Sequence, residues 1–348
     1  MRFCAFVLRI QKCLRISNTF NLVTTTVTIT LLWTVLFYHI FRGPVYVSVS
    51  KIMSSAIENN YTIYRTFDKV NIIEMPVILG RKDIRGYGNC IQRKPEVVMI
   101  GVPKCGTGSV RTFLNEHPYV AMEMNSEGVQ YFNLRYMRGP EWYRHQMPCS
   151  THDQLTIENS PQYFISEEAP ERMFKYNPKM KLILTVRNPI SRLESEFVQM
   201  AVGRPQFLTG TTIDENVIDP ETGKVNRRKT LVSKSIYIRY LKKWLEYFPV
   251  EQIHIVDGDE FARNPSEELN KIERFLNVEK FFKKEHFAYV ENRGFFCLQR
   301  KQSVECLEKG KGRLHPYINP NLMRKLQNFY ALFNEELFTT FGRRFNWA

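Results

Sequence analysis

Short apolar runs alternate along the chain with stretches that have the periodicity of amphipathic helices. The runs at residues 97–100, 181–186 and 253–256 are rich in aliphatic residues, which is typical of strands buried on both faces of a sheet. Helical periodicity occurs at residues 107–116, 190–200, 236–248 and 269–276. Strands that alternate with helices predict an α/β fold, in which a central parallel sheet is flanked by helices.

The N-terminal part of the chain has a different pattern. Residues 22–41 contain no Asp, Glu, Lys or Arg, and 20 helical residues span a hydrocarbon core of ~30 Å. Arg2, Arg9, Lys12 and Arg15 precede this stretch, whereas no acidic residue does. The positive-inside tendency therefore favours a type II transmembrane signal-anchor, with residues 1–21 in the cytosol, 42–93 as a lumenal stem and 94–348 as a lumenal folded domain. The alternatives are a buried soluble helix and a cleaved signal peptide; the long polar start and the lack of a small-residue cleavage site argue against the peptide.

The amino-acid composition indicates a polyanionic partner. Lys and Arg outnumber Asp and Glu by 49 to 35, which gives a net charge of +14. Such an excess suits nucleic acid, an anionic membrane or an acidic polysaccharide, and charge alone does not choose among them. A lumenal location excludes nucleic acid and favours the polysaccharide.

Glycosylation and cysteine patterns agree with a lumenal domain. Asn60 begins an Asn-Tyr-Thr sequon in the predicted stem. Of the seven cysteines, Cys297 and Cys306 lie close together in a loop-like stretch, and an oxidising compartment allows them to form a disulfide. The sequence leaves open the pairing of Cys90, Cys105 and Cys149.

The first predicted strand leads into residues 101–109, Gly-Val-Pro-Lys-Cys-Gly-Thr-Gly-Ser, here called the glycine loop, which precedes a predicted helix. Glycines let backbone N–H groups close around an anion, and the positive end of the helix dipole favours it further. An ordinary strand–turn–helix corner is the plain alternative, but Lys104 and two hydroxyl residues favour phosphate binding. The Gly-Lys-Ser/Thr ending of a nucleotide kinase loop is absent, which argues against a kinase.

The glycine loop resembles the 5'-phosphosulfate loop of sulfotransferases that use PAPS (3'-phosphoadenosine 5'-phosphosulfate), whose pattern is Gly-x-x-Lys-x-Gly-Thr. Arg187, in Val-Arg-Asn-Pro, and Ser195 resemble the 3'-phosphate site of the same enzymes. Residues 294–307 and 311–316 resemble their disulfide-bearing loop and the Lys-Gly-Arg segment that closes over the donor. The resemblance implies donor contacts from Lys104, Cys105, Gly106, Thr107, Gly108, Ser109, Arg187, Ser195, Phe296, Lys311, Gly312, Arg313, Leu314 and His315.

The subfamily that the sequence resembles is that of the heparan sulfate glucosamine 3-O-sulfotransferases. The matching segments begin at residues 142, 170, 253 and 273 and occur in the family's order, over residues 96–348. The resemblance implies a P-loop-like sulfotransferase fold, no metal, and transfer of a sulfuryl group from PAPS to a glucosamine 3-hydroxyl of heparan sulfate in the Golgi. Substrate contacts are expected from Gln130, Asn133, Asn159 and Trp244, although the helical periodicity around Trp244 favours a core position over a sugar contact.

The acceptor side departs from the family pattern at the general base. The family has a glutamate two residues before a His-Phe-Phe-Asp stretch; here Gly128 takes that position, Gln130 replaces the histidine and Asn133 the aspartate. Glu127 is the nearest carboxylate, and we expect it to be the base, with Lys104 as the other catalytic residue. Glu123 is a more distant candidate for the base, and a solvated loop carboxylate is the plain alternative for Glu127. Two alternatives remain: a relative that binds PAPS or glycan with little or no turnover, and N-sulfation of glucosamine.

Overall fold

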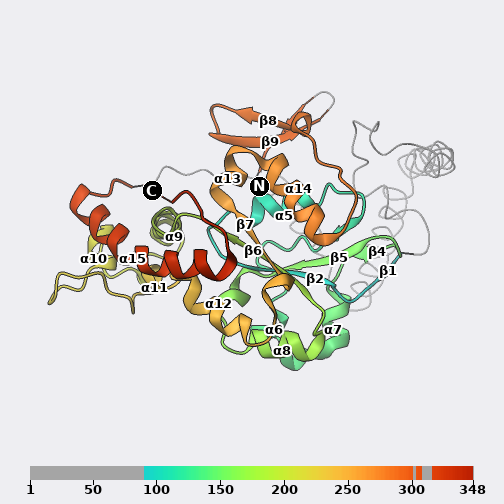
Figure 1. Ribbon diagram of the computed structural model, residues 1–348, viewed down its shortest axis with the longest axis horizontal. Coiled ribbons are helices and arrows are strands. Elements are labelled where there is room, and N and C mark those ends of the chain that lie inside the picture. Colours follow the sequence, from blue (N-terminus) through green and yellow to red (C-terminus); the bar gives the residue numbers. More distant parts are fainter. Residues whose placement is uncertain (1–89, 301–302, 308–315, 348) are drawn as a thin grey trace, which may run out of the picture. The chain divides into compact units, whose positions relative to one another are not determined.

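The computed structural model describes residues 90–300, 303–307 and 316–347 (Figure 1). The predicted signal-anchor at residues 22–41, the sequon at Asn60 and the predicted donor segment 311–315 lie outside the described residues. Within the part of the chain that is described, no helix is both long and apolar enough to cross a membrane.

A five-stranded parallel sheet forms the centre of the domain, as the sequence predicts. Its strand order is β3-β5-β2-β6-β7, and the bounds in that order are Val120–Met122, Leu155–Asn159, Val97–Gly101, Lys181–Val186 and Ile253–Asp257. The predicted strands are confirmed as β2, β6 and β7. The strands β3 and β5 were not predicted, because β3 has three residues and β5 carries the buried polar residues Thr156, Glu158 and Asn159.

Helices cover both faces of this sheet. Figure 1 shows α5, α13 and α14 on one face and α6, α7, α8 and α12 on the other, while α9 packs against α11 and α15. The four predicted helices are confirmed as α5, α9, α12 and α14. The bounds are α5 Thr107–Leu114, α6 Tyr131–Leu134, α7 Gly139–His145, α8 Ala169–Tyr176, α9 Pro189–Gly203, α10 Ile213–Val217, α11 Thr230–Ser233, α12 Tyr237–Leu245, α13 Gly258–Arg263, α14 Pro265–Leu276 and α15 Pro320–Phe341.

Two small antiparallel sheets complete the described domain. The first pairs β1 (Ile91–Gln92) with β4 (Cys149–Ser150), and the Cys90–Cys149 disulfide reinforces this pairing. Residues 90–93, counted above with the stem, are therefore held against the domain. The second sheet has the order β10-β9-β8, with bounds Val304–Glu305, Phe295–Gln299 and Phe287–Val290. Short 3₁₀ helices occur at Tyr136–Arg138 (η2), Pro161–Ile165 (η3), Pro205–Phe207 (η4), Val250–Gln252 (η5) and Lys284–His286 (η6).

Trp244 belongs to the hydrophobic core and does not reach the surface. Its side chain on α12 is fully buried, and its indole N–H donates a hydrogen bond to the Phe164 carbonyl at 3.1 Å. A buried indole normally needs such a partner, and the ring has no face left for a sugar. The expected substrate contact from Trp244 is therefore wrong, and the core position that helical periodicity indicated is right.

Candidate active site

The glycine loop connects β2 to α5 at the carboxyl edge of the parallel sheet, where α/β proteins commonly bind ligands. Gly106 precedes α5 with φ 94°, so the turn into the helix uses left-handed backbone that glycine adopts without steric cost. Lys104 also has a positive φ, of 76°, which is uncommon for a residue with a side chain. Strained positions of this kind are concentrated at functional sites.

Lys104 is directed toward α9. Its ammonium group donates a hydrogen bond to the side-chain carbonyl of Gln199. Ser195 lies four residues before Gln199, so both side chains lie on the same face of α9 and both line the pocket described below. The sequence had indicated Lys104 and Ser195, whereas Gln199 carried no motif and was missed.

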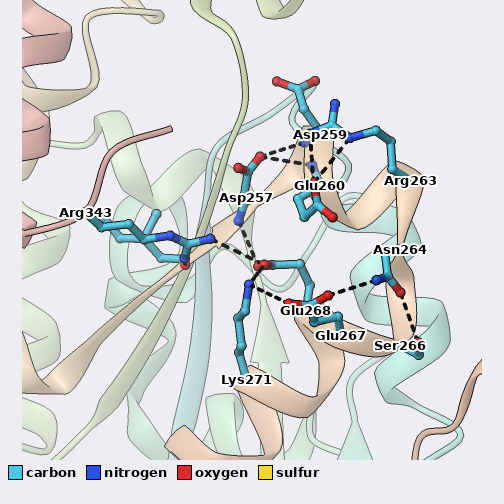
Figure 2. Close-up of polar contacts among 11 residues, drawn as sticks. Asp257, Asp259, Glu260, Arg263, Asn264, Ser266, Glu267, Glu268, Lys271 and Arg343 are labelled. Atoms are coloured by element: carbon cyan, nitrogen blue, oxygen red, sulfur yellow. Dashed lines mark hydrogen bonds and ion pairs between the residues drawn. The ribbon is translucent and has the colours of Figure 1, made fainter. Parts of the chain in front are cut away.

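Arg187 is held at the carboxyl end of β6 by the first turn of α13. The Asp259 carboxylate accepts a hydrogen bond from the Asn188 backbone N–H at 2.6 Å and lies 3.3 Å from Nε of Arg187. Figure 2 shows how this turn is built: the Asp257 carboxylate caps α13 by accepting hydrogen bonds from the N–H groups of Asp259 and Glu260, at 3.0 and 3.1 Å. An N-cap of this kind fixes the start of a helix, and it thereby places Asp259 beside Arg187.

A second layer of ionic contacts fixes the strand that carries this turn. Glu268 of α14 accepts a hydrogen bond from the Asp257 backbone N–H at 3.1 Å, and its side chain also contacts Lys271 and Arg343 (Figure 2). Arg343 donates a further hydrogen bond to the Ile255 carbonyl at 2.9 Å. The fully buried Glu268 carboxylate is thus balanced by two cations, as a buried charge requires.

Tyr237 of α12 joins the glycine loop to the Arg187 segment. Its hydroxyl donates a hydrogen bond to the Arg187 carbonyl at 2.8 Å and lies 3.5 Å from the Cys105 sulfur. The buried Arg192 makes a parallel connection, because it donates to the Pro103 carbonyl at 3.4 Å and to the Ser235 hydroxyl at 2.6 Å. These contacts bring two segments that are more than 80 residues apart into a single site.

These segments form one wall of a pocket of about 390 Å³, here called the main pocket. All nine predicted donor contacts that fall on described residues line it, and so does the predicted base Glu127. Lining residues that the sequence analysis did not single out come from α5, η3, α9 and α13: Phe113, Gln162, Val198, Gln199, Phe261 and Ala262. Aromatic or aliphatic side chains beside a cationic loop suit a ligand that combines a flat ring with phosphate groups.

Comparison with known proteins decides the family. The sulfotransferase domain family matches residues 94–342. Heparan sulfate glucosamine 3-O-sulfotransferase 5 of Mus musculus is 40% identical over 261 residues, which are 74% of this chain and 75% of that protein. The chain belongs to the heparan sulfate glucosamine 3-O-sulfotransferase family. The human 3-O-sulfotransferase 6 is 34% identical over 260 residues, 74% of this chain and 75% of that protein.

A solved structure independently shows the fold of this 3-O-sulfotransferase family member. A sulfotransferase from Alicyclobacillus acidocaldarius superposes with a TM-score of 0.55, over 73% of this chain and 98% of that protein. The sequence identity is 19%, so this likeness concerns the fold alone. It agrees with the predicted sulfotransferase architecture around a parallel sheet.

The structure gives a steric account of the glycine at the family's base position. Gly128 has φ +76°, and a Cβ built there would stand 2.5 Å from both the Asn159 carbonyl oxygen and the Ser160 hydroxyl oxygen. No side chain fits into this backbone. Glu127 lines the main pocket instead, and its loop is held by hydrogen bonds from the Glu127 N–H to the Asn125 side chain at 3.0 Å and from the Gln130 side chain to the Glu127 carbonyl at 2.9 Å.

The other expected acceptor contacts of this 3-O-sulfotransferase family member lie outside the wall of the main pocket. Gln130 and Asn133 are partly exposed at α6, and the Asn133 amide donates to the Gln130 side chain at 3.4 Å. Asn159 is only 2% exposed at the end of β5, so burial closes its side chain to a sugar in this structure. The expected substrate contact from Asn159 is therefore not supported.

Two buried carboxyl groups lie beneath this loop, at the ends of β3 and β5. Burial raises the pKa of Glu158 to about 8, although hydrogen bonds from the Ser160 and Tyr143 hydroxyls oppose the rise. Burial likewise raises the pKa of Glu123 to about 7, against a hydrogen bond from the Asn125 N–H and the nearby Arg111. Neither carboxyl lines the main pocket, so their place is in the support of the loop.

Both sheets at the domain's edge carry disulfides. The predicted Cys297–Cys306 bond is confirmed, with Cα atoms 4.6 Å apart. The open question about the other three cysteines is answered by a Cys90–Cys149 bond, with Cα atoms 5.4 Å apart, while Cys105 remains a buried thiol. Burial raises the pKa of the Cys105 thiol to about 11, so it stays protonated in the glycine loop.

Proposed function

We propose that this domain binds PAPS and transfers its sulfuryl group to a glucosamine 3-hydroxyl of heparan sulfate. The observation that carries the proposal is the convergence of Lys104, Arg187 and Ser195 on one pocket that Glu127 also lines. Family membership supplies the chemistry, because relatives bear the name heparan sulfate glucosamine 3-O-sulfotransferase. The net charge of +14 favours a sulfated polysaccharide as acceptor.

Each donor-side residue has a distinct role in this proposal. The N–H groups at the start of α5 and the Lys104 ammonium would bind the 5'-phosphosulfate, since a helix N-terminus attracts anions. Arg187 and Ser195 would bind the 3'-phosphate, with Asp259 keeping the guanidinium in place. The side chains of Phe113, Phe261 and Phe296 make the rest of the pocket apolar, which suits the adenosine.

The transfer step needs a base and a neutralised leaving group. The acceptor oxygen would form a bond to sulfur as the bond between sulfur and the bridging phosphate oxygen breaks. The proton of the acceptor hydroxyl would pass to the Glu127 carboxylate, and the Lys104 ammonium would neutralise charge on the departing phosphate. Both groups line the same pocket, which is the condition for this division of roles.

A transfer assay tests the proposal. The full chain is incubated with radiolabelled PAPS and heparan sulfate, and the labelled disaccharides are identified. We expect label at the glucosamine 3-oxygen, loss of transfer in Lys104→Ala, and normal transfer in Lys179→Ala, a control at an exposed lysine outside the pocket. Label on the glucosamine nitrogen would instead assign N-sulfation.

A second function, donor or glycan binding without turnover, is favoured by one observation. The backbone at Gly128 excludes any side chain, including a glutamate, from the position that holds the base in the family pattern. The two functions separate when the binding of PAP (adenosine 3',5'-bisphosphate) is measured beside transfer. Tight PAP binding without transfer of label would establish the non-catalytic function.

We further propose that the domain lies in the Golgi lumen and is attached to the membrane by a type II anchor at residues 22–41. Two disulfides among the described residues support an oxidising compartment. In sealed Golgi vesicles, we expect the domain to resist protease until detergent is added, and glycosidase treatment to remove a glycan from Asn60. Digestion of the domain in intact vesicles would refute this orientation.

A further inference from the structure

Arg300 forms a two-armed ion pair between the edge sheet of β8, β9 and β10, here called the disulfide-bearing hairpin, and the turn after α5. It directly follows β9, and its two terminal nitrogens donate to the two Glu116 carboxylate oxygens at 2.7 and 3.0 Å. Its Nε and one terminal nitrogen also donate to Glu305 of β10, at 2.9 and 2.6 Å. The guanidinium therefore joins three separate segments: β9, β10 and the turn after α5.

The elements that Arg300 joins are the elements that build the main pocket. The first residues of α5 belong to the glycine loop, and Glu116 lies two residues beyond the helix's last residue, Leu114. Phe296 of β9 lines the pocket, as does Leu307, which directly follows the disulfide. Arg300 and Glu116 do not line the pocket, but their contact joins the strand that carries Phe296 to the turn that follows α5.

Two other contacts hold different parts of the disulfide-bearing hairpin. Phe113 of α5 packs against Phe287 of β8, with ring centroids 5.1 Å apart, which fixes the hairpin at its first strand. Arg293 donates to the Leu307 carbonyl at 2.6 Å and closes the hairpin on itself. Phe296 lies on β9, which pairs with β8 along its length and also contacts α13, and the Arg300–Glu116 pair adds a direct link from the end of β9 to the turn after α5.

The burial of this pair separates it from ordinary surface ion pairs. The Arg300 and Glu116 side chains are 25% and 12% exposed, whereas the equally two-armed pair of Arg344 with Glu335 on α15 is 73% and 52% exposed. A two-armed pair in a partly desolvated place fixes geometry more strongly than an exposed one. Arg344 and Glu335 lie outside the main pocket, and they offer a natural control.

We propose that Arg300 and Glu116 are positioning residues for the sulfate donor. Their ion pair holds β9, which carries the pocket residue Phe296, in a fixed position relative to the glycine loop. This side of the pocket is therefore already ordered when the donor binds. The inference rests on the proposed binding of PAPS but not on turnover. It predicts a loss in donor affinity with little change in the rate of the chemical step.

The test measures PAP binding by calorimetry on the full chain, with Arg300→Met, Glu116→Gln and the control Arg344→Met. We expect PAP to bind about 5- to 20-fold more weakly to the first two variants, a size common for coupling between two sites, and normally to the control. In transfer assays, KM for PAPS should rise by a similar factor, while kcat at saturating PAPS stays within about two-fold.

A double-variant cycle separates positioning from a general loss of stability. If the pair acts as a unit, Arg300→Met with Glu116→Gln weakens PAP binding no more than either change alone. Full additivity, or unchanged PAP affinity in both folded single variants, overturns the inference. If Arg300→Met does not fold, Glu116→Gln, which keeps the shape of the side chain, decides alone. Failure of the unmodified chain to bind PAP instead refutes the proposed function.

Discussion

Gly128 packs so tightly against Ser160 that a Cβ on this glycine would stand 2.5 Å from the serine hydroxyl oxygen. The same hydroxyl accepts a hydrogen bond from the Gln130 N–H at 2.8 Å and donates one to the buried Glu158 carboxyl. The loop that should carry the general base is thereby fixed to the end of β5. Restoring a glutamate at residue 128 would therefore require the backbone of this loop to move, and not only a change of side chain.

We expect Gly128→Ala to destabilise the domain strongly. An alanine there must keep the left-handed backbone conformation, which costs roughly 1–2 kcal/mol. Its methyl group must also displace Asn159 or Ser160, which adds roughly 1–3 kcal/mol. Gly342→Ala is the matched control, because Gly342 also has a positive φ, of 59°, but open space around it. In urea unfolding, the control should lose only the backbone cost of roughly 1–2 kcal/mol from its free energy of unfolding. Equal losses in the two variants would show that packing at Gly128 is unimportant.

Sequence patterns predicted the central architecture because buried strands and amphipathic helices have strong periodicities. The strands β2, β6 and β7 and the helices α5, α9, α12 and α14 have the expected positions. The strand β5 escaped detection since Glu158, a buried carboxyl, breaks the apolar pattern that a buried strand usually shows. Its burial is possible because the Ser160 and Tyr143 hydroxyls donate hydrogen bonds to it, and the contact from Tyr143 on α7 is a feature that no local pattern displays.

The donor side of the candidate site was predictable and the acceptor side was not, for a physical reason. Phosphate binding depends on a local motif, so Lys104 and its neighbours could be identified from consecutive residues. Asp259, Gln199 and Tyr237 act through contacts across the fold, which sequence spacing does not encode. The family resemblance indicated that Asn159 contacts the acceptor, but this residue is buried at the end of β5, inside the parallel sheet.

We expect Glu127→Gln to remove most transfer activity without changing PAP affinity. The substitution keeps the shape of the side chain but removes its capacity to accept a proton, and a positioned base typically contributes about 10²–10⁴-fold to the rate. Glu171→Gln is the matched control, since this exposed carboxylate on α8 lies outside the main pocket. Initial rates at saturating PAPS check the prediction. Transfer by Glu127→Gln at the unmodified rate would exclude this carboxylate as the base.

We expect Arg187→Ala to weaken discrimination between PAP and adenosine 5'-phosphate, with Ser195 left as the remaining contact to the 3'-phosphate. The two ligands differ only in the 3'-phosphate, and hydrogen bonds to a charged group contribute about 1.5–3 kcal/mol, or roughly 10- to 150-fold in affinity. Arg263→Ala is the control, because Arg263 lies on α13 near Asp259 but pairs with Glu260 at the surface. Calorimetry with both ligands gives the ratio. A ratio unchanged by Arg187→Ala would place the 3'-phosphate elsewhere.

The buried Glu158 should make the domain less stable as the pH rises from 6.5 to 8.5. Burial raises its pKa to about 8 in the folded state, above the ~4.3 of an unfolded glutamate. The folded state therefore binds more protons over this interval, and the free energy of unfolding falls as the pH approaches 8. His117 and His254, whose pKa burial lowers to about 4, act in the opposite sense, and their effect fades as the pH rises above the ~6.5 of an unfolded histidine.

The measurement compares thermal unfolding of the unmodified chain with Glu158→Gln and with Glu335→Gln, a control at an exposed glutamate on α15. Between pH 6.5 and 8.5, Tm should fall in the unmodified chain and in the control, and clearly less in Glu158→Gln, where Glu123 still titrates with a raised pKa. Because the amide keeps partners for the Ser160 and Tyr143 hydroxyls, folding of this variant is expected. An identical pH dependence of Tm in all three proteins would show that Glu158 is already ionised in the folded state.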